Sequence, residues 1–190
     1  LSWWVASDHF EELGRPASLL HGGFGLLTIG NLRKPRFWAL KLLERLGPEE
    51  LAVELDGDGA GGLVEAWASR DPDGGRVAVA LWNVTLDQTR STGEPLLDRR
   101  VTLQVEGLAA PAYEVRHLRV DLERSNITYV WEAMSGGADW PDDDQWAALR
   151  EANRLEELEP VRRVAAAGGA VELAFGLPMP SVSLVELVPA

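Results

Sequence analysis

The feature that most constrains the fold is a series of short segments in which apolar and polar residues roughly alternate. A period of two is typical of strands with one buried face, and the glycines, prolines and aspartates between the segments favour tight turns. Strands at this spacing predict an antiparallel β-sandwich. The predicted strands cover residues 51–55, 63–69, 76–83, 101–106, 112–121, 171–175 and 181–188.

Helical patterns interrupt the strands in two places. Residues 31–47 carry apolar side chains at helical spacing, with Asn31 as the predicted N-cap and a Gly-Pro pair at the end. Residues 126–134 predict a second, short helix. A third helix is predicted through Glu157, with Asp144 as its cap. These two later helices form a predicted insertion near residues 126–158 of the sandwich.

The first 47 residues do not make a complete unit. Leu1 to Ala6 is an apolar run typical of a buried strand, and a loop rich in carboxylates and glycine separates it from the helix. One strand and one helix cannot bury both their faces, so they need neighbours, as each βα unit of a barrel does. We therefore expect residues 1–47 to end a (β/α)8 barrel whose other elements precede Leu1, and residues 48–190 to form the sandwich domain. The predicted fold class is mainly β.

Charge narrows the choice of ligand. The chain of 190 residues has a formal net charge of -12, which disfavours nucleic acid and anionic membranes as partners, because like charges repel. A neutral sugar is compatible with this charge. There is no run of about 18 apolar residues that could span a membrane, and there is no cysteine. The acidic run of residues 142–144 lacks the spacing of a calcium loop and favours a helix start, so neither a metal nor a cofactor is predicted.

The opening loop resembles a known family. The stretches SDHFEE at residues 7–12, HGGFGL at 21–26 and RKP at 33–35 resemble the C-terminal part of glycoside hydrolase family 39, which holds β-xylosidases and α-L-iduronidases. The tail at residues 177–187 resembles the closing strands of that family. The resemblance implies a (β/α)8 barrel with an appended β-sandwich. It also implies a retaining mechanism, with one carboxyl as acid/base and a second as nucleophile.

No counterpart of either catalytic carboxyl is found in this chain. The acid/base of the family follows an asparagine directly, and no Asn-Glu dipeptide occurs here. The resemblance therefore places both carboxyls upstream of Leu1. This chain alone is expected to be inactive, and it needs either the missing barrel portion or an oligomer partner.

The resemblance implies that Trp4, Glu11 and Glu12 line the sugar subsite. An indole face covers the C–H face of a sugar ring, and carboxylates accept hydrogen bonds from its hydroxyls. His21 is either a subsite donor or a structural histidine tied to the glycine turn. Two carboxylates in this loop would repel a uronate. Xylose or a xylo-oligosaccharide is therefore the favoured substrate, and an iduronidase is the alternative within the family.

A second hypothesis is a free-standing carbohydrate-binding or interaction module. A module of that kind would expose a row of aromatic side chains on the sandwich, drawn from its tryptophans, whereas burial would make the sandwich a scaffold. We expect Trp67 and Trp82 to be buried, because they lie in predicted strands, and His117 to be structural. The tryptophans concerned are Trp67, Trp82, Trp131, Trp140 and Trp146.

Overall fold

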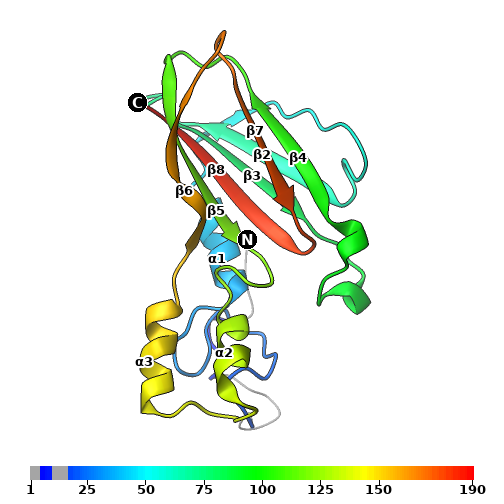
Figure 1. Cartoon of the computed structure of the whole chain (residues 1–190), viewed down its shortest axis with the longest axis vertical. Coiled ribbons are helices and arrows are strands. Elements are labelled where there is room, and N and C mark those ends of the chain that lie inside the picture. The colour runs from blue at the N-terminus through cyan, green and yellow to red at the C-terminus, as the bar shows by residue number, and fades with distance from the viewer. Residues whose placement is uncertain (1–4, 10–16) are drawn as a thin grey trace.

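The computed structural model describes residues 5–9 and 17–190 (Figure 1). Eight strands and three α-helices lie in these ranges, together with two short 3-10 turns at Gln88–Arg90 and Pro95–Leu97. The elements are α1 (Pro35–Leu43), β1 (Glu49–Leu51), β2 (Val64–Arg70), β3 (Val77–Asn83), β4 (Arg99–Val105), β5 (Ala112–Val120), α2 (Ile127–Ser135), α3 (Asp143–Ala152), β6 (Glu156–Ala165), β7 (Val171–Leu177) and β8 (Ser181–Pro189).

The strands form two antiparallel sheets that pack face to face. The larger sheet has the order β1-β2-β3-β8-β5-β6, and β4 pairs with β7 in the smaller one. A core of apolar side chains fills the space between them, with Val79, Tyr113, Leu173 and Leu187 among its members. The predicted β-sandwich is confirmed.

The outer face of the large sheet packs against α1. Trp38 and Leu42 of α1 lie in a second core with Ala80 and Leu184 of the central strands. β3 is therefore covered on both sides, by the small sheet on one and by α1 on the other. This explains why its sequence VAVALWN is almost wholly apolar and not alternating.

A third core joins the N-terminal segment to the helical insertion. Leu19 and Leu32 pack with Ile127, Trp131 and Leu149 of α2 and α3. The N-terminal segment, drawn in blue, accordingly lies beside these two helices at the end of the molecule away from the sandwich (Figure 1). The N-terminal segment therefore packs against α2 and α3, and the chain continues from it into α1.

Two helix predictions are wrong at their ends. The first helix begins at Pro35 with Lys34 at its N-cap, not at Asn31. Asn31 has a φ of 61° in the turn before it, a conformation that asparagine tolerates. α3 is capped by Asp142, not Asp144, through a capping box with Gln145, and it ends at Ala152.

The residues after α3 form a strand that the sequence did not predict. β6 pairs with β5 at the edge of the large sheet, and it carries glutamate and arginine side chains where a half-buried strand would carry apolar ones. Charged residues on an edge strand protect it from pairing with other chains. Such a strand lacks the alternation used to recognise it. The strand predicted at residues 51–55 is wrong in place, because β1 covers Glu49–Leu51 and shares only Leu51 with it.

The five tryptophans do not form one exposed row. Trp131 is 5% exposed, whereas Trp67 is 46% exposed, so the expectation that Trp67 is buried is wrong. Trp67 lies on the outer face of β2, opposite Ala80, where it lines a hollow of about 350 Å³ with Leu40 and Leu43 of α1. Trp82, Trp140 and Trp146 are partly buried.

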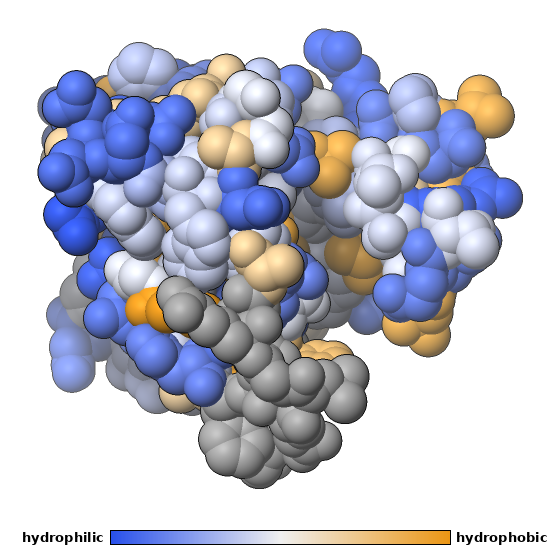
Figure 2. Space-filling view, turned by 90° about the horizontal axis from the view of Figure 1, so that it is seen from below, coloured by the Kyte–Doolittle hydropathy of each residue, from blue (hydrophilic) through white to orange (hydrophobic). Residues whose placement is uncertain are grey.

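The surface is mainly hydrophilic on the face that carries α2 and α3. Hydrophobic residues there form small, separate patches (Figure 2). In the described residues, no helix has the length and apolar character needed to cross a bilayer.

His117 is buried in the large sheet at 3% exposure. Its Nε2 lies 3.0 Å from Ser183 Oγ, and Arg119 Nε donates to the same oxygen at 2.7 Å. Burial, together with the positive charges of the nearby Arg119 and Arg162, lowers the pKa of His117 from 6.5 to about 3.

This burial predicts acid sensitivity. The unfolded chain binds a proton on His117 below pH 6.5 and the folded chain does not until about pH 3. The contribution of His117 to the free energy of unfolding is therefore fully present above pH 6.5. It is lost as the pH falls, by up to ~1.4 kcal/mol per pH unit. In urea titrations between pH 7 and pH 4, we expect His117→Gln to lose less stability than the parent. The exposed His9→Gln should match the parent, and an equal slope for all three proteins would contradict the assignment.

Candidate functional site

Three of the four predicted sugar-contacting residues lie outside the described part of the chain. Trp4, Glu11 and Glu12 fall within residues 1–4 and 10–16, so their predicted role stays a prediction. The fourth, His21, is described. Residues on both sides of the 10–16 stretch are also described, and they meet at one buried carboxylate.

That carboxylate belongs to Asp8, which is 0% exposed. The main chain of residues 5–8 pairs with residues 26–27, through bonds such as Asp8 N to Leu27 O at 3.0 Å. Asp8 Oδ1 accepts the Gly25 N–H at 2.8 Å, and Oδ2 forms an ion pair with Lys34. A buried charge is stable only when it is paired and hydrogen-bonded. Asp8 meets both conditions.

Lys34 closes the arrangement from the other side. Its side chain is 7% exposed, and its Nζ donates to Gly23 O at 3.0 Å as well as pairing with Asp8. Its main chain N–H donates to Leu26 O, and it is the N-cap residue of α1. One ammonium therefore joins the strand end, the glycine turn and the start of the helix. The two ends of segment 9–24 are held together at this point.

His21 lies beside the same pair. Its Nε2 is 3.8 Å from Asp8 Oδ2, and its side chain is 17% exposed. In this position His21 lies next to the glycine turn, and its role as a sugar contact stays a prediction.

Gly25 is required by the close approach of Asp8. A Cβ at this position would lie 2.5 Å from both Asp8 N and Asp8 Oδ1. We expect Gly25→Ala to lower the free energy of unfolding by at least about 3 kcal/mol, because backbone atoms cannot move aside. Gly74, which has open space around its Cβ position, provides the control. Gly74→Ala should change stability by less than ~0.5 kcal/mol in the same thermal melts, and equal effects would refute the packing argument.

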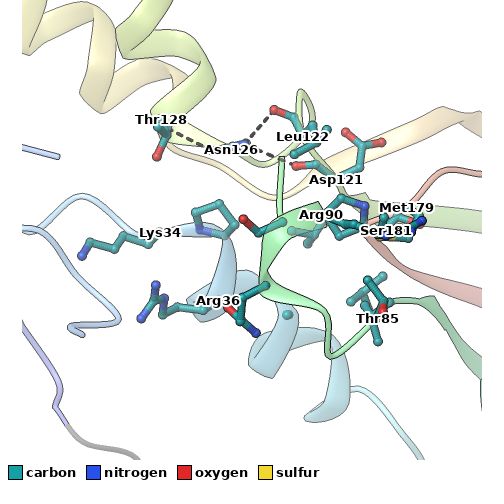
Figure 3. A pocket seen from close by; sticks show the side chains of 18 of the residues that line it. Lys34, Arg36, Thr85, Arg90, Asp121, Leu122, Asn126, Thr128, Met179 and Ser181 are labelled. Carbon is teal, nitrogen blue, oxygen red and sulfur yellow. Dashed lines mark hydrogen bonds between the residues drawn. The ribbon is translucent and has the colours of Figure 1, made fainter. Parts of the chain in front are cut away.

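A cleft of about 690 Å³ opens next to Lys34, between the N-terminal segment and the loops at one end of the sandwich. Its walls come from the start of α1, the turn at residues 84–91, the loop before α2 and the turn that enters β8 (Figure 3). Asn126 fixes the loop before α2: its amide donates to Leu122 O at 2.7 Å and its Oδ1 accepts from Thr128 N at 3.0 Å. Sites of this size between chain segments are typical of ligand binding.

Sequence reasoning missed the roles of Asp8 and Lys34. Both residues lie in the motifs at residues 7–12 and 33–35, but neither was given a role of its own. A charged residue directly after an apolar run, with a glycine-rich turn downstream, was an available signal for a buried carboxylate. The partner could not be found in this way, because nothing local links residue 8 to residue 34. In the described residues, no cluster of three or more His, Asp or Glu could hold a metal ion.

Comparison with known proteins gives a consistent result. The chain is 31% identical over 186 residues to a β-xylosidase of Geobacillus stearothermophilus, covering 98% of this chain and 33% of that protein. A β-xylosidase of Caldicellulosiruptor saccharolyticus is 40% identical over 55 residues, which is 29% of this chain and 11% of that protein. The chain therefore spans about a third of the length of the first of these relatives.

Solved structures agree with this picture. The GH39 enzyme of Xanthomonas axonopodis pv. citri superposes with a TM-score of 0.79 at 25% identity, over 100% of this chain and 37% of that one. A monomeric β-xylosidase of Caulobacter crescentus gives 0.75 at 27% identity, over 100% and 37%. A bacterial orthologue of human α-L-iduronidase gives 0.68 at 28% identity, over 84% and 28%.

The model of the glycosyl hydrolases family 39 matches residues 1–170, which include the buried Asp8 pair, α1 and most of the sandwich. The chain belongs to glycosyl hydrolase family 39.

Proposed function

We propose that this chain is the C-terminal part of a retaining glycoside hydrolase that acts on β-xylosides. The observation that carries the proposal is the 31% identity over 186 residues to a β-xylosidase. Residues 1–47 would contribute the last strand, loop and helix of the barrel, and the sandwich would brace them through α1. The two catalytic carboxyls would lie in the part of the relatives that this chain does not span.

The buried Asp8–Lys34 pair supports a binding role for the loop at residues 9–24, which lies between the two paired residues in the chain. It ties both ends of segment 9–24 to the start of α1, so the carboxylates of Glu11 and Glu12 would be presented from a fixed base. Trp4, Glu11 and Glu12 would contact the sugar. Two carboxylates suit a neutral pentose better than a uronate, because a third negative charge in a desolvated pocket costs several kcal/mol.

The test uses the complete protein that contains this chain. We expect it to hydrolyse 4-nitrophenyl β-xyloside and to release β-xylose first, as a retaining mechanism requires. An NMR time course of the product reports the anomer directly. Glu12→Gln and Glu11→Gln should each lower kcat/KM by roughly tenfold or more, a loss of ~1.4 kcal/mol of transition-state binding.

Matched measurements distinguish the alternatives. Hydrolysis of an α-L-iduronide in preference to the xyloside would reverse the substrate assignment. The purified 190-residue chain should show no turnover of either substrate. Turnover by this chain that Glu11→Gln abolishes would show that the catalytic groups lie within it.

A further inference from the structure

The connection between α2 and α3 contacts the residues that follow positions 10–16. The Leu19 N–H donates to Asp139 O at 3.0 Å, and the Trp140 indole N–H donates to Ala17 O at 3.0 Å. Leu19 is fully buried in the core that it shares with α2 and α3. An insertion of the sandwich domain therefore holds the main chain of the N-terminal segment at residues 17 and 19.

Gln145 makes this connection a firm support. Its side-chain amide donates to Met134 O in the last turn of α2 at 3.0 Å, and its side-chain oxygen accepts the Asp142 N–H at 3.0 Å. The Asp142 carboxylate in turn accepts the Gln145 N–H at 2.8 Å, which completes the capping box of α3. One side chain thus joins the end of α2 to the start of α3, and Asp139 and Trp140 lie between these two points.

The helix pair holds the N-terminal segment as far as the start of α1. The Trp146 ring packs so closely on Gly30 that a Cβ there would overlap it. Asn153, at the end of α3, forms two hydrogen bonds with the main chain of Arg33. Its Oδ1 accepts from the N–H at 2.7 Å, and its amide donates to the carbonyl at 2.8 Å. The segment from residue 17 to residue 33 is therefore held along the helix pair, as its course beside α2 and α3 shows (Figure 1).

The stretch that carries Glu11 and Glu12 lies between two anchored points of the chain. Asp8 precedes it and is buried in its ion pair, and Ala17 follows it and is bonded to Trp140. Anchoring both ends of a loop removes many of its conformations before a ligand arrives, which lowers the entropy cost of binding. A weaker attachment at either end should therefore weaken ligand binding without changing the chemistry of the bound state.

We propose that Trp140 is a positioning residue for the sugar subsite. Its N–H holds residue 17, and the α2–α3 connection thereby presents Glu11 and Glu12 to the sugar in one arrangement. The inference rests on the proposed function, which assigns these two glutamates to the subsite. It adds a role for the helical insertion, which acts on the site through the loop and does not touch the sugar. The sandwich domain then contributes to substrate affinity as well as bracing the barrel.

The experiment compares Trp140→Phe with the parent in the complete protein that contains this chain, with 4-nitrophenyl β-xyloside as substrate. Phenylalanine keeps an aromatic ring but has no N–H to bond to residue 17. We expect KM and the inhibition constant of xylose to rise together by about fivefold, while kcat stays within about twofold, because ground-state and transition-state binding are lost equally. Trp140→Ala, which also removes the ring, should raise KM by about tenfold or more.

Trp67→Phe is the matched control, because Trp67 is a 46% exposed tryptophan of β2, outside the helix pair and the N-terminal segment. It should keep the KM of the parent. Native-state hydrogen exchange of the 190-residue chain supplies a readout that needs no substrate. The Leu19 amide, which donates to Asp139, should exchange faster in Trp140→Phe and at the parent rate in Trp67→Phe.

An unchanged KM in Trp140→Phe overturns the inference, as does a fall in kcat at constant KM or an equal rise of KM in Trp67→Phe. The 190-residue chain with Trp140→Phe should melt within about 4 °C of the parent. A larger fall would show general destabilisation and would also overturn the positioning role. If the parent hydrolyses no xyloside, the proposed function fails and the role in sugar binding fails with it. Parent hydrolysis with an unchanged KM in Trp140→Phe rejects the positioning role alone.

Discussion

The Asp8→Ala variant is expected to be among the least stable single substitutions in this protein, with a loss of roughly 3–5 kcal/mol in the free energy of unfolding. Asp8 is fully buried and Lys34 nearly so. Removing the carboxylate breaks the buried ion pair with Lys34 and leaves the Gly25 N–H without the Asp8 acceptor. Each of these losses carries a desolvation cost that water cannot repay. For a chain of this length the melting temperature should fall by roughly 10 °C.

A double-mutant cycle separates the charge from the hydrogen bond. Asp8→Asn keeps an oxygen for Gly25 but removes the charge, and Lys34→Met keeps the length of the side chain. We expect the double variant to be more stable than the sum of the single losses predicts, because once the ion pair is broken by the first substitution the second has no pair left to break. Asp58→Asn serves as the exposed control, since its side chain is 87% exposed in the pair with Arg99. Additive losses in the cycle would show that the ion pair contributes nothing as a pair.

The Glu186→Ala variant should lose roughly 3 kcal/mol, near the lower limit for a broken buried ion pair. The Glu186 side chain is 4% exposed and accepts bonds from Arg45 at 2.7 Å and from Arg76 at 2.8 Å. Arg45 follows α1, whereas Glu186 lies in β8, so this carboxylate joins the helix to the outer face of the large sheet. The arginines keep some contact with water, which limits the cost of leaving them unpaired.

An exposed pair of the same geometry provides the control. Glu49 accepts two hydrogen bonds from Arg70, as Glu186 does from Arg45. The side chains of Glu49 and Arg70 are each 44% exposed, however. Surface pairs contribute ~0–1 kcal/mol, so Glu49→Ala should melt within about 4 °C of the parent. The prediction fails if Glu49→Ala and Glu186→Ala are destabilised equally. It also fails if Glu186→Ala retains the parent's stability in urea.

The sequence by itself determined the sandwich, because period-two alternation between glycine and aspartate turns is a local property that antiparallel strands require. Six of the eight strands lie close to their predicted ranges, and the family resemblance came from short motifs around residues 7–35. β6 was missed because an edge strand with glutamates and arginines carries no apolar alternation. α1 was predicted to begin too early because Asn31 serves a turn with positive φ and not a helix cap.

Only the tertiary structure decided which polar residues are buried and what they contact. Asp8 and Lys34 are 26 positions apart, and Arg45 and Glu186 are 141 apart, so no local pattern could pair them. The same holds for Trp67, because a strand pattern does not show whether a helix covers the outer face of the sheet. Periodicity reports which face of an element is apolar, whereas the contacts of a charge or an indole depend on how the elements pack against one another.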